Sequence, residues 1–253
     1  MEVMDLLGAL FRWFHIIAGL LFVGLNWWFN LVFTPFAGAT DGETRKKAVL
    51  ELVPRGLYWF KWSAIYTGIF GLFLLIVIFY MGGMTIEVQQ AWTTGSYIMA
   101  ILVLLIYRVY VVLANSALGK DLRMMGAIGF AIVAVMIFGM IAFGNFSYRG
   151  YVIHLGVMFG VIMIANVFET ILPSQNKIIK AIKGGAVPDP LLVSRIAQRS
   201  QHNMYLSVPL LWTMIEAHTA VPAANSWLYS LAVVAFGWIM VAYVLKKTTK
   251  VQG

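Results

Sequence analysis

The sequence contains no cysteine, and charged residues make up only 11% of it. The absence of cysteine excludes, within this chain, disulfides, iron–sulfur clusters and covalent attachment of a c-type haem through C-x-x-C-H. The scarcity of charge, beside 61% hydrophobic residues, excludes an ordinary soluble domain and predicts a polytopic membrane protein. The four histidines are then the strongest nitrogen ligands present.

Several apolar stretches are each near the roughly 20 residues that a helix needs to cross the hydrocarbon core. They comprise residues 7–34, 57–82, 92–116, 124–145, 149–172, 203–219 and 225–245. We therefore expect an all-α fold, with residues 1–253 forming one integral membrane domain, a bundle of about seven transmembrane helices. The first apolar run is too long for a cleavable signal peptide.

Two polar segments between the spans have helical patterns of their own. GETRKKAVLELVPRG, after the first span, predicts a short interfacial helix. SQNKIIKAIKGGAVPDP, after the fifth span, predicts a basic helix followed by a turn. Asp189 before Pro190 then predicts the start of the next helix, with a capping side chain followed by proline at the first helical position.

The basic residues orient the predicted bundle. Of the 18 lysines and arginines, 15 lie in or beside the first, third and fifth loops, Arg199 included, or in the tail that contains Lys250. Arg12 and Arg149 lie on the opposite side, and Arg108 lies within the third span. The positive-inside rule then places the N-terminus outside and the C-terminus in the cytoplasm of a bacterial-type inner membrane. Because topology accounts for the net charge of +8, we expect no nucleic-acid partner.

Three histidines from three different spans are predicted to reach the outer leaflet: His15, His154 and His218. Ionisable residues inside membranes are costly and usually functional. Two facing histidines in a helical bundle are the usual means of holding a non-covalent b-type haem. We expect His15 and His154 to ligate haem b, with His218 either an alternative ligand or a supporting residue.

The two outer arginines lie close to these histidines in the sequence. Arg12 precedes His15 by three residues, and Arg149 precedes His154 by five. Since arginine binds carboxylates through paired hydrogen bonds, both are candidate partners of the haem propionates, although both also suit simple interfacial snorkelling.

Small residues beside the histidines have two interpretations. Ala18 and Gly19 follow His15, and three glycines, Gly150, Gly156 and Gly160, flank His154. They leave room for a flat ring, or they serve close helix packing. A copper or zinc site at His15 and His154 is an alternative to haem, since imidazole suits those metals.

A second polar group is predicted toward the cytoplasmic side. His202, Asn203, Arg199 and Arg108 are expected to shape a pocket for a substrate or a quinol. The alternative for Arg108 is an ion pair with Glu169, near the inner end of the fifth span.

Three segments together resemble the membrane domain of the cytochrome-c-linked, membrane-bound urate oxidases (urate hydroxylases): RWFHIIAGLLFVG (12–24), HLGVMFGVIMIANVFETILPSQNK (154–177) and RSQHNMYLSVPLLWTMIEAH (199–218). The positions that match its motifs are Arg199, His202, Asn203, Tyr205, Pro209, His154, Asn166, His15 and His218. The sequence departs from the family pattern at Ala217, where the family has asparagine, and at Glu169, where an apolar residue is expected.

The resemblance implies a membrane redox protein. Family members that oxidise urate carry a C-terminal cytochrome c domain, and no C-x-x-C-H motif is present here, so electrons are expected to leave to a separate cytochrome c. The leading interpretation is a b-type haem protein that passes electrons from a quinol or small-molecule reductant to an external cytochrome c or larger redox complex at the outer face. The alternatives are the catalytic membrane subunit of a urate-type oxidase and a non-redox transporter or structural subunit.

Overall fold

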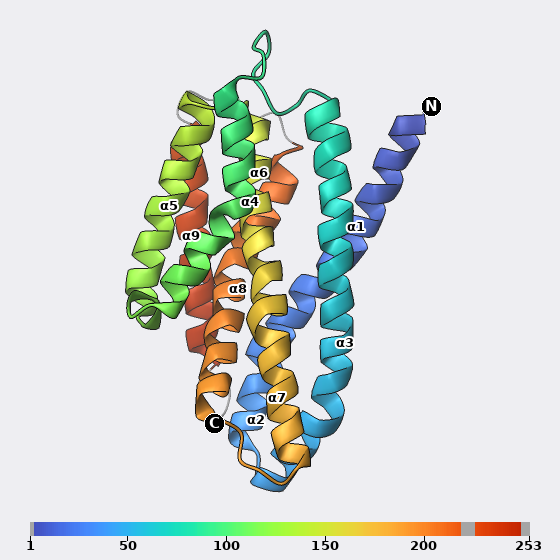
Figure 1. Cartoon of the computed structure of the whole chain (residues 1–253), viewed down its shortest axis with the longest axis vertical. Helices are drawn as coiled ribbons and strands as arrows, with labels where there is room; N and C mark the ends of the chain where they lie inside the picture. Colours follow the sequence, from blue (N-terminus) through green and yellow to red (C-terminus); the bar gives the residue numbers. More distant parts are fainter. Residues whose placement is uncertain (1–2, 219–225, 249–253) are drawn as a thin grey trace. The chain divides into compact units, whose positions relative to one another are not determined.

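The structure, a computed structural model, describes residues 3–218 and 226–248. Lys250 and the predicted span ends at positions 219 and 225 lie outside these residues. The described chain is helical apart from its connections and one isolated bridge between Ile86 and Phe146, which confirms the all-α prediction. The helices are α1 Val3–Trp28, η1 Phe29–Phe33, α2 Thr34–Ala39, α3 Gly42–Leu74, η2 Leu75–Met81, α4 Thr94–Asn115, η3 Leu118–Lys120, α5 Leu122–Ala142, α6 Tyr148–Ala165, η4 Asn166–Ile171, α7 Leu172–Lys183, α8 Pro190–Glu216 and α9 Ser226–Thr248 (Figure 1).

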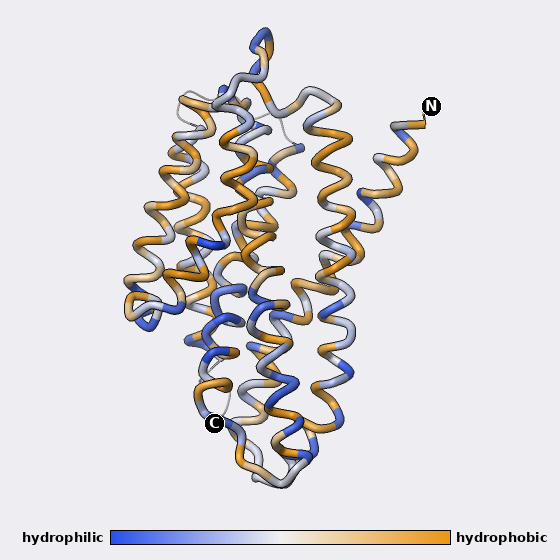
Figure 2. The backbone as a smooth tube through the Cα atoms, in the orientation of Figure 1, coloured by the Kyte–Doolittle hydropathy of each residue, from blue (hydrophilic) through white to orange (hydrophobic). Residues whose placement is uncertain are grey.

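Among the described residues, six helical stretches are long and apolar enough to cross a membrane. They are Asp5–Ala39, Gly42–Met81, Thr94–Asn115, Leu122–Ala142, Tyr148–Lys183 and Ser226–Thr248. The protein is therefore a multi-pass membrane protein. The predicted span 203–219 falls largely in α8, which is helical to Glu216 but is less apolar because polar residues occupy its first turns (Figure 2).

The segment between the first two spans differs from the prediction. GETRKKAVLELVPRG does not form a separate interfacial helix but the first turns of α3, which continues through Pro54 to Leu74. Proline removes one backbone hydrogen bond, and here the helix continues past that loss. Asp41 caps the helix, since its Oδ1 accepts hydrogen bonds from the backbone N–H groups of Glu43 and Thr44 at 2.9 and 3.0 Å.

The other predicted polar segment is confirmed. Residues 172–183 form the basic helix α7, which ends at Gly184. Pro190 begins α8, and Oδ1 of Asp189 accepts a hydrogen bond from the backbone N–H of Leu191 at 2.8 Å. The N-cap followed by proline therefore starts α8 where the sequence indicated.

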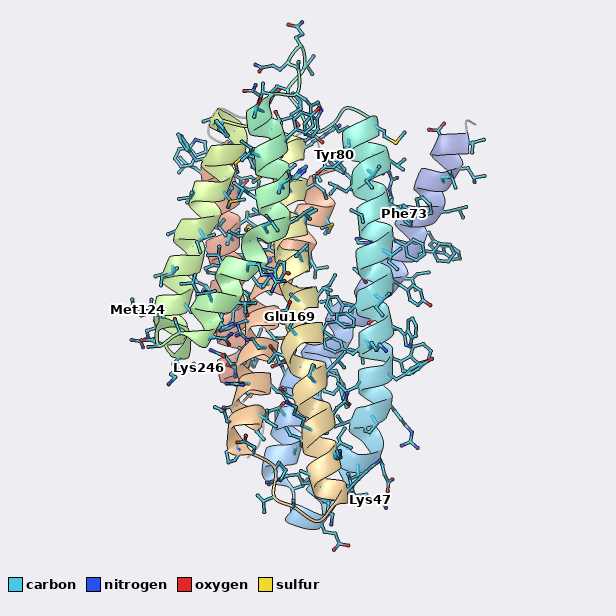
Figure 3. The ribbon with its side chains drawn as sticks, viewed as in Figure 1. Lys47, Phe73, Tyr80, Met124, Glu169 and Lys246 are labelled. Atoms are coloured by element: carbon cyan, nitrogen blue, oxygen red, sulfur yellow. The ribbon has the colours of Figure 1, made fainter. Side chains whose placement is uncertain are left out.

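The chain divides into two compact units. Unit 1 comprises Met1–Leu74, Met163–Tyr205 and Met240–Gly253, and unit 2 comprises Leu75–Ile162 and Leu206–Ile239. In unit 1, α1 packs on α3 through aromatic pairs, including Phe11 stacked on Phe73 at 5.0 Å between ring centroids (Figure 3). In unit 2, the hydroxyl of Ser96 donates to the carbonyl of Gly144 at 2.7 Å and so ties the start of α4 to the end of α5.

Candidate functional site

Three of the predicted pocket residues lie together on α8 inside unit 1. Arg199, His202 and Asn203 are only 2%, 6% and 0% exposed. Asn203 accepts a hydrogen bond at Oδ1 from Nδ2 of Asn166 (2.8 Å), and its own Nδ2 donates to the carbonyl of Met163 (3.1 Å). Asn166 is the first residue of the π-helical segment η4, and such segments frequently mark functional sites.

Arg199 was counted with the basic residues beside the fifth loop and was also assigned to the predicted pocket. It lies within α8 and is almost completely buried. The side chain has interactions within the protein, yet its Nε and Nη1 atoms are buried without a hydrogen-bond partner among the described residues. The guanidinium is a planar group whose N–H donors suit anionic or carbonyl acceptors.

Two further asparagines of unit 1, one of them bonded to α8, were not assigned to a site in the sequence analysis. Nδ2 of Asn30, in the π-helical segment η1, donates to Oγ of Ser200 and to the carbonyl of Asn26, both at 2.7 Å. The amide of Asn26 is 0% exposed, and neither its nitrogen nor its oxygen has a hydrogen-bond partner in the described chain. The available signal was an i, i+4 pair of amides inside an apolar span, where polar groups are costly.

His15, also in unit 1, is held by a backbone carbonyl of α3. Its Nδ1 lies 3.0 Å from the carbonyl oxygen of Thr67. Because a carbonyl only accepts, Nδ1 carries the proton in the neutral ring and Nε2 keeps the lone pair. The ring lies against Gly71, where an added Cβ would come within 2.9 Å of Cε1. Arg12, one turn earlier on α1, is exposed.

His154, in unit 2, lies in a different kind of environment. Its Nδ1 donates to the carbonyl of Gly150 at 2.7 Å, and the hydroxyl of Tyr80 donates to its Nε2 at 3.0 Å. The ring is 0% exposed and packs edge-on against Phe146 at 4.7 Å. Tyr80, labelled in Figure 3, therefore uses the lone pair that an iron ligand would need, so that His154 fits a haem only if this hydroxyl moves away.

Two of the three glycines around His154 are accounted for by packing. An added Cβ at Gly150 would collide with the carbonyl of Thr85, and one at Gly156 would meet the side chains of Thr213 and Met214. An added Cβ would make only ordinary contacts at Gly19 in unit 1, 3.9 Å from Thr67, and at Gly160 in unit 2, 3.9 Å from Leu210. Close helix packing therefore accounts for Gly150 and Gly156, and it does not require glycine at Gly19 or Gly160.

The remaining predicted residues are placed as follows. His218 is exposed just after α8, and Arg149 is half-buried in the first turn of α6; both have interactions within the protein. The guanidinium of Arg108 lies 4.7 Å from the ring centroid of Tyr107 in unit 2, and Glu169 is exposed on η4 in unit 1. Among residues 3–218 and 226–248, no group of three or more His, Cys, Asp or Glu side chains could hold a metal ion.

Arg199, His202 and Asn203 are called the α8 cluster below. The comparisons with known proteins bear on the stretch that contains it. Searches of curated proteins and of solved structures find no match to the chain. The model of one family, described as urate oxidase N-terminal, matches residues 42–252. The match includes Asn166, Arg199, His202 and Asn203, and it begins after His15 and Asn26. Because it covers most of the sequence, the chain belongs to the urate oxidase N-terminal family.

Proposed function

We propose that this protein is the membrane-integral part of a urate-oxidase-like oxidoreductase that takes electrons from a small planar reductant. The observation that carries the proposal is the burial of Arg199, His202 and Asn203 together on α8, within the stretch that matches the family. Burying a guanidinium and amides inside a membrane protein costs free energy, and such groups are usually retained because they have a function.

The chemistry of the cluster suits urate. Urate is flat, anionic at neutral pH and edged by carbonyl and N–H groups. The guanidinium of Arg199 binds an anionic edge, and the imidazole of His202 takes up a proton as the ring is oxidised. In the hydroxylation of urate, water supplies the added oxygen, and the substrate and the water together release a pair of electrons and a pair of protons. The electrons pass one at a time to a one-electron acceptor.

We further propose that the protein would hold haem b as its internal acceptor, with His15 among the residues that would bind it. The hydrogen bond from Nδ1 to the carbonyl of Thr67 leaves Nε2 available, which is how ligating histidines are usually oriented. When bound, haem b supplies a one-electron carrier. His154 and His218 are the other candidate ligands in this proposal, and His154 becomes available only once its bond to Tyr80 is given up. Arg12 and Arg149 are the candidate partners of the propionates. Copper or zinc at His15 and His154 is the less favoured alternative.

The external acceptor in this proposal is a cytochrome c, or a larger redox complex, at the outer face of a bacterial-type inner membrane. The positive-inside rule supports that orientation, because the basic residues lie almost entirely on one side of the predicted spans.

Purified, haem-supplied protein tests the proposal. With urate and cytochrome c, the expected result is urate consumption coupled to cytochrome c reduction, together with a b-type pyridine haemochrome spectrum. Haem without urate consumption would leave an electron-transfer subunit that uses another reductant. Absence of both would leave the transporter or structural role.

A further inference from the structure

Asn26 is the most unusual polar residue in the described chain. Its side chain is completely buried, at 0% exposure, and both Nδ2 and Oδ1 lack a hydrogen-bond partner among residues 3–218 and 226–248. Nearly all buried polar groups in proteins are hydrogen-bonded, because an unmade bond loses the hydration of the group without replacement. An amide with both ends unsatisfied therefore indicates a ligand that supplies an acceptor and a donor side by side.

The turn that carries Asn26 is tied to the α8 cluster. The side-chain nitrogen of Asn30, one turn later, donates both to the backbone carbonyl of Asn26 and to Oγ of Ser200, the neighbour of Arg199. Within unit 1, α1 and α8 run in opposite directions (Figure 1). Asn26 lies four residues before Asn30 and Asn203 lies three residues after Ser200, so that each is about one helical turn from the Asn30–Ser200 hydrogen bond.

We propose that Asn26 is a specificity-determining residue of the α8 site and that its amide reads the adjacent carbonyl and N–H groups of a lactam edge. Nδ2 donates to the ligand carbonyl, and Oδ1 accepts from the neighbouring ring N–H. The guanidinium of Arg199 holds another, electron-rich edge of the same flat ring. The chemical class is an oxidised purine or a similar cyclic ureide; this choice of class rests on the proposed function, whereas the position of the site rests on the unsatisfied amide.

The first test is stability without ligand. Asn26→Leu replaces the amide with an apolar side chain of similar size, and replacing an unsatisfied buried amide in this way does not lower stability. We expect the melting temperature of the ligand-free variant in detergent to equal or exceed that of the wild type. The matched control is Asn166→Leu, which removes the donor to Asn203 and is expected to lower the melting temperature. A similar loss in Asn26→Leu would overturn the proposal, because it would mean that the amide is satisfied by water or by the protein.

The second test is binding, measured without turnover. Wild-type protein is titrated with urate, with xanthine, and with purine, which has no lactam edge. We expect the lactam compounds to bind at least about 10-fold more tightly than purine, and Asn26→Leu to abolish that difference, since a site built to hydrogen-bond a group rejects the analogue that lacks it. An undiminished preference in Asn26→Leu, or none in the wild type, would overturn the proposal. Because binding is measured separately, an Asn26-dependent preference in a protein that does not oxidise urate would contradict the proposed function and leave this inference standing.

Discussion

The buried polar groups of the two units are satisfied to different extents. In unit 2, Tyr80 bonds to His154, and the hydroxyl of Tyr148 donates to Oε1 of Glu216 at 2.9 Å. Apart from the indole nitrogens of Trp212 and Trp238, every unsatisfied buried side-chain atom in the described chain belongs to unit 1. These atoms are in Asn26, Arg199, Thr40 and Thr67.

This difference distinguishes buried polar groups that stabilise the fold from buried polar groups that could bind a ligand. A closed network, in which each donor has its acceptor, strengthens a fold and offers little to a ligand. Open groups, buried at a cost, are retained where something binds them. In the proposal above, Asn26 and Arg199 are the groups that bind a ligand, and the Tyr80–His154 pair is a closed support.

The largest effect is expected at Arg199. Arg199→Gln removes the charge and the planar guanidinium, and we expect kcat/KM for urate to fall about 100-fold, because hydrogen bonds to a charged group contribute about 1.5–3 kcal/mol each. Steady-state oxidation with cytochrome c as acceptor measures it. Arg199→Lys, which keeps the charge without the planar guanidinium, should lie between the two. Unchanged turnover in a folded Arg199→Gln protein would remove the α8 cluster from the site.

A second large effect is expected beside His15. Gly71→Ala places a Cβ within 2.9 Å of the imidazole and forces the ring to shift, so this variant should lose most of its haem. Gly19→Ala is the matched control, because its Cβ meets only Thr67 at 3.9 Å and haem should be retained. The pyridine haemochrome assay gives haem per protein for both. Full haem content in Gly71→Ala would exclude His15 as a ligand.

A moderate effect is expected at the hydrogen-bonded pair of Tyr80 and His154. Tyr80→Phe leaves Nε2 of His154 buried without its donor, which should lower the free energy of unfolding by about 1–3 kcal/mol. Because the lone pair then becomes available to iron, haem content should stay the same or rise. Thermal unfolding and the haem spectrum, taken on the same preparation, separate the two consequences. A fall in haem content would show that Tyr80 supports the haem site.

The smallest effect is expected at a surface cap outside both regions. Hydrogen bonds from the side chain and backbone of Thr44 lower the pKa of Asp41. A carboxylate whose pKa is lower in the folded state stabilises the protein above its unfolded pKa, and this contribution disappears as the pH falls through the folded pKa. Asp41→Ala should therefore be slightly less stable at neutral pH and equal to the wild type in acid, as followed by melting temperature against pH.

Much of the fold could be predicted from the sequence because its signals are local. The apolar runs predicted the helices, and Asp189–Pro190 predicted the start of α8. Arg199, His202 and Asn203 were assigned to one pocket because they are contiguous on one helix. The continuation of α3 through Pro54 was missed, because proline more often ends or kinks a helix.

The hydrogen-bond partners of the site residues could not be predicted from the sequence. Tyr80 is 74 positions from His154, and Asn30 is 170 positions from Ser200, so that neither hydrogen bond has a signal in the local sequence. The roles of the glycines depended in the same way on which helix lies opposite them. Asn26 had a detectable signal, an amide inside an apolar span, but only the ionisable residues of that span were assigned to a site.

The most direct test of the account is anaerobic reduction by urate, followed in the visible spectrum of purified protein supplied with haem. If the α8 cluster binds the reductant and its electrons pass to the haem, adding urate will produce the same reduced α-band that dithionite produces. In Arg199→Gln, urate will no longer produce this band, whereas dithionite still will. A protein whose haem is reduced by dithionite and never by urate would contradict the account.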